Sequence, residues 1–242
     1  MNVKFTVEYK GTNYCGWQIQ KDQPTIQGEL TNAFQILFPN EKINIIGSGR
    51  TDAGVHAFGQ VISIQLPDKI ELAKIVKSIN GIMSHDIFIK DYEIVKDDFN
   101  ARYSAKSRMY QYFINQIFSP FNLDTSWYVQ ESLDYSLLEQ CSKLLIGEHD
   151  FSSLSKHNPD IINKNCIIFE SFWTFNNNNL IFTIKSNRFL HHMVRFIMGA
   201  SIEVAKNKMN IHDFSELINN NSTKSPLCAP PKGLFLYEVL YD

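Results

Sequence analysis

The order of strand-like and helix-like segments is the feature that most constrains the fold of this chain. In the first hundred residues, strand-like alternation covers 3–9, 43–46, 58–66 and 87–95, and helical spacing covers 25–37 and the stretch that follows Pro67. The resulting order, β-α-β-β-α-β, is the split βαβ pattern of ferredoxin-like domains. The first half is therefore predicted to be an α+β unit.

The second half shows the same order of elements. Strand-like segments cover 106–117, 166–175, 180–186 and 234–240, and helical segments cover 135–146 and 190–204. A boundary near Asn100 would divide the chain into two halves, 1–100 and 101–242. Two half-sheets side by side would leave a cleft between them, which is a common place for a functional site.

Composition limits the classes of protein to which the chain can belong. Hydrophobic residues make up 44% and charged residues 20% of the 242 residues, which is ordinary for a soluble globular protein. No apolar run approaches the roughly 18 residues of a membrane helix, and the start lacks the apolar stretch of a signal peptide, so a cytoplasmic location is expected. The cysteines, histidines and glycines match no common metal or phosphate-loop motif. Any chemistry is therefore expected to use ordinary side chains, with no metal and no cofactor.

The basic residues are mostly lysines. The chain has 18 lysines and only five arginines, which are Arg50, Arg102, Arg108, Arg188 and Arg195. Together with its many asparagines and isoleucines, this indicates a bias toward lysine wherever a bare positive charge suffices. Positions that keep arginine are then candidates for planar, bidentate hydrogen bonding that lysine does not provide. Chance placement in so small a sample is the alternative.

The most specific stretch is Gly47-Ser-Gly-Arg-Thr-Asp-Ala-Gly-Val-His-Ala. Its three glycines within eight residues favour a tight turn between two strands. Arg50 and Asp52 are two residues apart, so in extended backbone they point to the same side, where the arginine favours the ionised carboxylate. This arrangement suits Asp52 as a nucleophile or a base. The structural alternative is an aspartate that caps the turn and pairs with a surface arginine.

A second stretch alternates cations with aromatic residues. Arg108, Tyr110 and Tyr112 share one face of a predicted strand. Such a face suits a nucleic-acid surface, because rings stack on bases and arginines reach phosphates. An ordinary half-buried aromatic strand has the same pattern.

Two later stretches contribute one candidate each. Arg195 lies on an otherwise apolar helix, and a buried arginine predicts an acidic partner. The adjacent His191 and His192 face different sides of a helix, which suits packing or phosphate contact better than metal binding. The stretch Ala229-Pro-Pro-Lys-Gly-Leu-Phe, which contains Leu234, delivers an apolar strand at a fixed angle and by itself is structural.

Together, these stretches and the early Tyr9-Lys-Gly-Thr-Asn-Tyr-Cys-Gly-Trp-Gln resemble the TruA family of tRNA pseudouridine synthases. The resemblance covers nearly the whole chain in the same order, and Gly-Arg-Thr-Asp-Ala-Gly-Val-His is its most specific motif. It implies two ferredoxin-like halves joined into a mixed sheet with the site in a central cleft. It also implies a cofactor-free homodimer.

The resemblance further implies a reaction and residue roles. Family members isomerise uridine to pseudouridine in the tRNA anticodon stem-loop, at tRNA positions 38 to 40. Asp52 matches the essential aspartate, which attacks either the ribose or the base. Tyr110 matches the tyrosine that stacks on the target uracil, and Arg195 matches the arginine that pairs with the aspartate. Arg50 stands where the family contacts RNA near the flipped nucleotide, and Leu234 stands where an apolar residue packs against the base.

Two other classes compete with this interpretation. A catalytically silent RNA-binding protein on the same scaffold would need the aromatic strand but neither Asp52 nor Arg195. A carboxylate-dependent hydrolase would need a second carboxylate to activate water, and none lies within the four stretches.

Overall fold

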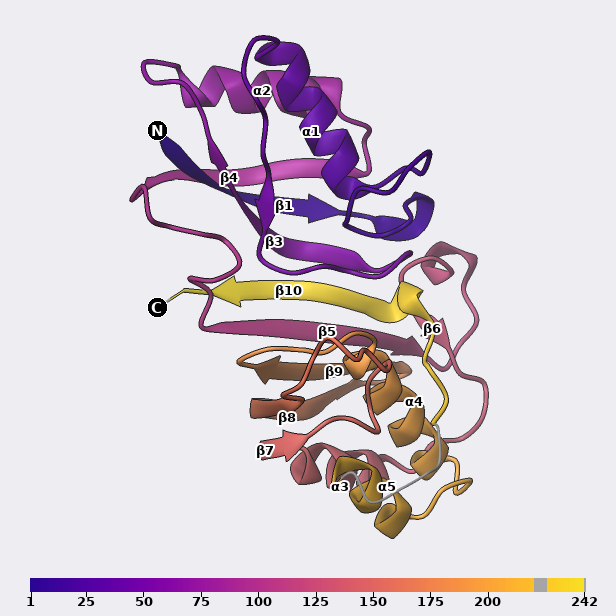
Figure 1. The fold of residues 1–242 in the computed structure, drawn as a ribbon. Helices are drawn as coiled ribbons and strands as arrows, with labels where there is room; N and C mark the ends of the chain where they lie inside the picture. The colour runs from indigo at the N-terminus through magenta and orange to yellow at the C-terminus, as the bar shows by residue number, and fades with distance from the viewer. Residues whose placement is uncertain (220–225, 242) are drawn as a thin grey trace. The chain divides into compact units, whose positions relative to one another are not determined.

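The computed structural model describes residues 1–219 and 226–241, which fold into two compact units (Figure 1). The first unit comprises Met1–Lys106 together with the C-terminal segment from Phe235, and the second comprises Ser107–Leu234. Helices and strands occur in both units, and the strands pair in antiparallel and parallel fashion, so the predicted α+β class is confirmed. The division into halves 1–100 and 101–242 stays a prediction about domains.

The first unit has the predicted order of elements. They are β1 (Asn2–Tyr9), α1 (Ile26–Leu37), β2 (Ile46–Gly47), β3 (His56–Gln65), α2 (Leu72–Ile82) and β4 (Ile87–Val95), joined by β10 (Leu234–Leu240). The strands lie in the order β4-β1-β3-β10, and β2 also pairs with β3. All these pairs are antiparallel except β10 with β3, which are parallel with Phe235 opposite His56.

The core of the first unit lies between its sheet and its two helices. Val3, Phe5 and Val7 alternate along β1 and are fully buried, as the period of two predicts. The ring of Phe5 lies 5.5 Å from that of Phe34 on α1, and Figure 1 shows α1 beside α2. Helix α1 begins one residue after its predicted start, because the Thr25 hydroxyl accepts a hydrogen bond from the Gly28 amide at the N-cap.

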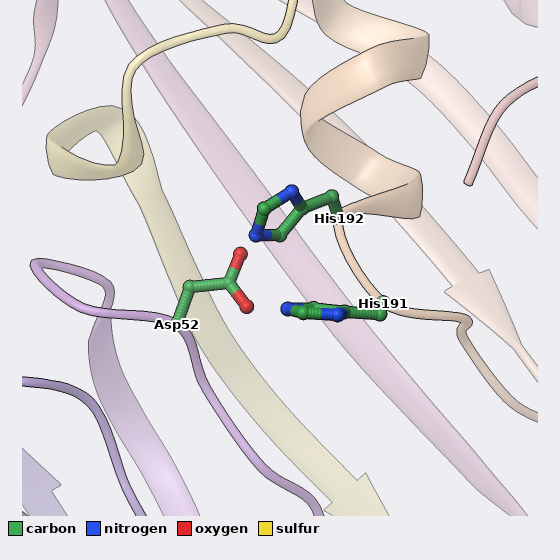
Figure 2. Close-up of side chains that lie close together, drawn as sticks. All are labelled: Asp52, His191 and His192. Atoms are coloured by element: carbon green, nitrogen blue, oxygen red, sulfur yellow. The ribbon is translucent and has the colours of Figure 1, made fainter. Parts of the chain in front are cut away.

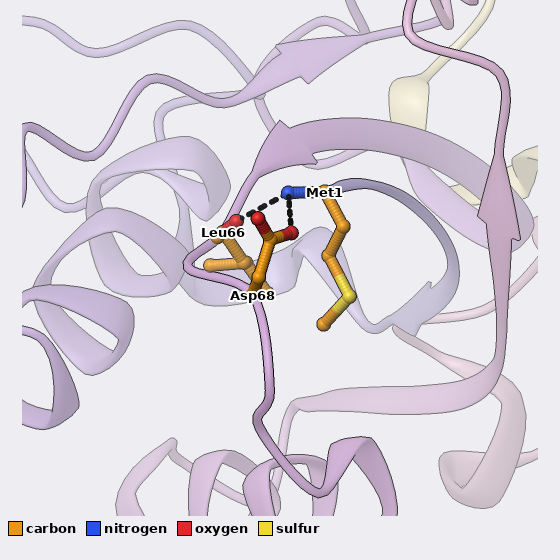
Figure 3. Close-up of polar contacts among 3 residues, drawn as sticks. All are labelled: Met1, Leu66 and Asp68. Carbon is orange, nitrogen blue, oxygen red and sulfur yellow. Dashed lines mark hydrogen bonds and ion pairs between the residues drawn. The ribbon is translucent and has the colours of Figure 1, made fainter.

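Helix α2 begins at Leu72, five residues after the predicted start at Pro67. The intervening turn is tied to the start of the chain (Figure 3). The Met1 amino group donates to the Leu66 carbonyl at 2.7 Å and to Asp68 Oδ1 at 3.0 Å, and the Leu66 amide donates to the Met1 carbonyl. In the same turn, Lys69 has a φ of 63°, which is incompatible with a right-handed helix. The prediction therefore placed the start of α2 too early.

Strand β2 is shorter than the predicted strand 43–46. Only Ile46 and Gly47 pair with β3. The carbonyl of Ile45 instead accepts a hydrogen bond from the side chain of Gln27 at 3.0 Å. A side chain on α1 thus takes the place of a strand partner.

Among its described residues, the second unit contains a four-stranded antiparallel path and three α-helices. Its elements are β5 (Ser107–Asn115), β6 (Trp127–Tyr128), α3 (Tyr135–Leu144), β7 (Gly147–Asp150), β8 (Asn165–Asn176), β9 (Asn179–Ser186), α4 (Met193–Ala205) and α5 (Ile211–Ile218). The strand order is β5-β9-β8-β7, with β6 pairing β5, and the three helices pack on one another (Figure 1). The strand-like segments 166–175 and 180–186 are confirmed as β8 and β9, which form a hairpin in which Asn176 pairs with Asn179. Strands β6 and β7 and helix α5 were not predicted.

Helix α4 begins at Met193 and not at the predicted residue 190. His192, just before it, adopts the left-handed conformation with φ 63° and ψ 2°, which a right-handed helix cannot include. The carbonyl of His191 accepts a hydrogen bond from the Lys156 amide at 2.9 Å. The histidine pair therefore forms a turn that leads into the helix.

Two expectations from composition bear on the described residues. The four cysteines, Cys15, Cys141, Cys166 and Cys228, are free thiols. Among residues 1–219 and 226–241, no helix has the length and apolar character needed to cross a membrane.

Candidate active site

Asp52 lies in the loop between β2 and β3 and is half-buried (Figure 2). The loop leaves β2 with the Ser48 amide donating to the Val61 carbonyl at 2.8 Å. It then closes into a turn in which the Val55 amide donates to the Asp52 carbonyl at 3.1 Å and Gly54 has a φ of 76°. The tight turn that the glycines predict is therefore present, and Asp52 stands at its start.

The Asp52 loop rests on the segment that follows β1. The Trp17 amide donates to the Thr51 carbonyl at 3.0 Å, and the Gly54 amide donates to the Tyr14 carbonyl at 3.3 Å. The Gly11 amide donates to Nδ1 of His56 at 3.0 Å. An imidazole whose Nδ1 accepts is the neutral form with its proton on Nε2. Residues 11–17 thus hold the loop on both sides of Asp52.

This contact explains the glycines of the early stretch. A Cβ atom on Gly11 would lie 2.0 Å from the Val55 carbonyl oxygen. One on Gly16 would lie 2.7 Å from the Thr51 oxygen, and Gly16 has a φ of 91° that other residues rarely adopt. Both positions require glycine because two backbone segments meet there.

Gly16→Ala is therefore expected to lower the free energy of unfolding by about 2 kcal/mol, since it combines a positive φ with a backbone clash. Urea unfolding measures this loss. Gly81→Ala is the matched control, because Gly81 lies in α2 and nothing stands within 4 Å of its Cβ position; alanine there should be neutral or slightly stabilising. Equal stability of Gly16→Ala and the unchanged protein would contradict the close-approach argument.

A set of polar side chains underlies the same loop. The Tyr9 and Thr51 hydroxyls are hydrogen-bonded at 2.8 Å. The Ser48 hydroxyl donates to Gln60 Oε1 at 2.6 Å, and Gln60 Nε2 donates to the Gly49 carbonyl at 2.9 Å. Burial raises the pKa of Tyr9, so its phenol stays protonated. Arg50 lies between Gly49 and Thr51 in the chain, and its side chain is exposed to solvent.

Tyr110 and Tyr112 lie on β5, in the second unit. Tyr110 is buried, with its ring edge-on to Phe189 at 5.0 Å. Tyr112 is fully buried, and its hydroxyl donates to the Pro230 carbonyl at 2.7 Å. Of the two alternatives for Tyr112, the structure therefore supports the ordinary strand residue, because this side chain belongs to the core. Arg108 donates through Nη1 to the Asn187 carbonyl at 3.0 Å.

Arg195 lies in the first turn of α4 and is joined to the segment that precedes Leu234. Its Nε donates to the Ala229 carbonyl at 2.8 Å, and the Ala229 amide donates back to the Arg195 carbonyl at 3.0 Å. Leu234 follows a single 3₁₀ turn, Pro231–Gly233, and is buried. The second unit thus connects Arg195 with the approach to Leu234. Asp52 and Arg50 belong to the first unit, and the predicted convergence of Asp52, Tyr110 and Arg195 stays a prediction.

His191 and His192 are drawn in Figure 2 at the turn before α4. Their ring centroids lie 4.1 Å apart, and His192 also approaches Phe196 at 6.2 Å. A left-handed conformation in a residue other than glycine costs free energy and often marks a functional turn. The sequence shows the two histidines side by side, but nothing in it indicates the left-handed conformation of His192.

The two buried cysteines are unsuited to act as nucleophiles. Burial raises the pKa of Cys141 to about 12 and that of Cys166 to about 11. Both thiols therefore stay protonated near neutral pH, and a thiol is a far weaker nucleophile than a thiolate.

Comparison with known proteins places the chain in a family. A family model described as tRNA pseudouridine synthase matches residues 6–104 and 141–242. tRNA pseudouridine synthase A of Dictyoglomus thermophilum is 39% identical over 100% of both chains. tRNA pseudouridine synthase A 1 of Protochlamydia amoebophila is 37% identical over 99% of this chain and 96% of its own. The corresponding protein of Chlorobium limicola is 37% identical over 99% of both. Similarity at this level extends from end to end, and the chain therefore belongs to the tRNA pseudouridine synthase family.

Proposed function

We propose that this protein isomerises uridine to pseudouridine in the anticodon stem-loop of tRNA, with Asp52 as the nucleophile. The observation that carries the proposal is the setting of Asp52. It is a half-buried carboxylate in a loop held by backbone hydrogen bonds on both sides, within a chain that matches tRNA pseudouridine synthases over its full length. A reactive group needs such a fixed position to be effective.

The reaction makes modest demands on the protein. The bond between N1 of uracil and C1′ of ribose breaks, the base turns, and C5 bonds to C1′; the hydrogen on C5 leaves as a proton, and N1 gains one. No electrons are exchanged with another molecule, so no redox cofactor is required. A carboxylate suits the task because it can form a covalent ester with ribose or base and leave again.

Other residues take supporting roles in the proposal. Tyr110 stacks on the target uracil after the nucleotide has left its helix. Arg195 pairs with the Asp52 carboxylate, and its bond to the Ala229 carbonyl supports this role by fixing the guanidinium plane. Arg50, being exposed, contacts RNA, and Leu234 packs against the base. The net charge of −2 is compatible with phosphate binding, because a local basic surface suffices.

The proposal also covers the assembly and its place in the cell. We infer a homodimer, as the resemblance to the TruA family implies, and a cytoplasmic location, where tRNA is available. Sedimentation of the purified protein tests the first inference, and fractionation of cells tests the second.

The proposal is tested by incubating the protein with a tRNA transcript that carries tritium at C5 of uridine. Isomerisation releases this tritium into water. Release of about one tritium per modified uridine supports the proposal, whereas tight binding without release would favour a catalytically silent RNA-binding protein.

Removing metal ions is expected to leave the reaction unchanged, because the proposed chemistry uses a carboxylate and no Lewis acid. The measurement is tritium release after exhaustive chelation, with magnesium restored only to fold the tRNA. Zinc added back serves as the control. An activity that chelation abolishes and zinc restores would contradict this expectation and would point to the histidines as ligands.

A further inference from the structure

Four polar side chains form a buried network beneath the Asp52 loop. Tyr9, Ser48, Thr51 and Gln60 are 3%, 1%, 8% and 0% exposed. Tyr9 is hydrogen-bonded to Thr51 Oγ1 at 2.8 Å, and the polar side chain of Gln60 lies near enough to the phenol to influence its pKa. Gln60 in turn accepts from the Ser48 hydroxyl at 2.6 Å and donates to the Gly49 carbonyl at 2.9 Å. The network thus runs from β1 through β3 into the loop.

The network reaches the loop on both sides of Arg50. Ser48 and Gly49 precede this residue, and Thr51 follows it, directly before Asp52. Thr51 is held twice, since its hydroxyl bonds Tyr9 and its carbonyl accepts from the Trp17 amide at 3.0 Å. With side chain and carbonyl both fixed, the peptide plane between Thr51 and Asp52 has little freedom to rotate.

A network of this kind is costly unless it is complete. Each buried polar group that loses its partner costs desolvation free energy, and an apolar core of the same volume would serve stability equally well. A fully bonded network contributes a unique geometry. The hydrogen bonds of this network converge on the loop that carries Asp52. The network therefore fixes the geometry of this loop.

We propose that Tyr9 and Gln60 are positioning residues for Asp52, acting through Ser48, Gly49 and Thr51. The inference rests on the proposed function of Asp52. Neither residue acts as an acid or a base: the Tyr9 phenol is buried and protonated, and an amide does not titrate. Their effect is on where the carboxylate points.

Tyr9→Phe is the first test, because it removes one hydroxyl and keeps the ring. We expect the single-turnover rate to fall about fivefold with the dissociation constant for tRNA unchanged, as the loss of one buried hydrogen bond predicts. The shape of the pH–rate profile should also stay the same. Thr51→Val removes the other partner and should give a similar loss, while Thr51→Ser keeps the hydroxyl and should restore most of the rate.

The double variant Tyr9→Phe with Thr51→Val distinguishes the shared bond from two separate effects. Both substitutions remove the same hydrogen bond, so the double variant should be little slower than either single variant. Tyr241→Phe is the matched control, because that hydroxyl donates to the Ala101 carbonyl at 2.8 Å, in the same unit but outside the network. It should lose stability and retain the full rate. Equal rates for Tyr9→Phe and Tyr241→Phe would overturn the proposal.

Amide hydrogen exchange gives a readout that does not depend on activity. In Tyr9→Phe, peptides that cover 48–55 should exchange faster than in the unchanged protein, whereas Tyr241→Phe should leave them protected. Unchanged exchange of this loop in Tyr9→Phe would overturn the positioning role, whatever the activity assay shows. An unchanged protein that releases no tritium from tRNA would instead overturn the proposed function.

Discussion

Replacing Asp52 by asparagine is expected to lower the rate of uridine isomerisation by at least about a thousandfold, the usual cost of removing a nucleophile. Asparagine keeps the size and most of the shape of the side chain but cannot form the covalent ester. The affinity for tRNA should stay within a few-fold, because phosphate contacts supply most of the binding free energy. Single-turnover tritium release and filter binding measure the two quantities separately.

The structure indicates that Asp52→Asn removes the carboxylate without removing the hydrogen bonds that hold its loop. The loop is anchored by Ser48, Thr51 and Gly54, through bonds to Gln60, Tyr9 and the Tyr14 carbonyl, and all of these remain in the variant. Thermal unfolding should therefore be nearly unchanged. A folded variant that keeps more than about one thousandth of the rate would show that Asp52 is not the nucleophile.

Replacing Arg195 by lysine is expected to lower the single-turnover rate by at least about tenfold, a loss near 1.4 kcal/mol in the transition state. The Nε of Arg195 already donates a hydrogen bond to the Ala229 carbonyl at 2.8 Å. In the proposed site, its Nη groups make two parallel hydrogen bonds to the Asp52 carboxylate. A lysine ammonium carries the charge but is a single point donor on a mobile stem, so it cannot hold both partners.

The composition of the chain supports the same expectation. Eighteen lysines occupy most basic positions, so an arginine on an apolar helix suggests that the planar group is needed. Lys74→Arg is the reciprocal control: Lys74 is 76% exposed and pairs with Glu71 at 2.7 Å, and arginine there should be silent. Equal rates for Arg195→Lys and the unchanged protein would show that charge alone suffices.

Local patterns predict much of the fold. The bounds of β4 and β10 are as the alternation indicates, and α1 begins one residue after its predicted start. The errors arise where distant partners decide the outcome. The start of α2 is delayed by bonds between Met1 and the turn after β3, and the start of α4 by the backbone of His192. Strand β10 pairs in parallel with β3, and no local sequence pattern predicts this pairing.

The candidate site shows the same division. The glycine-flanked motif indicates Asp52 as a candidate catalytic residue, and the tight turn that it predicts is present in the structure. The support beneath it was not predicted, because Tyr9 and Gln60 are unremarkable residues on separate strands until folding brings them to Thr51 and Ser48. Tyr112 shows where spacing alone cannot decide. Its spacing fits both a nucleic-acid surface and an ordinary strand, and the hydrogen bond of its hydroxyl to the Pro230 carbonyl, far along the chain, marks it as a core residue.

The most direct test of the central claim is to map pseudouridine, by chemical probing at single-nucleotide resolution, in an unmodified tRNA transcript incubated with this protein. The unchanged protein should convert uridines of the anticodon stem-loop, and Asp52→Asn should convert none. A transcript that is bound but contains no pseudouridine, or conversion that persists in Asp52→Asn, would contradict the account.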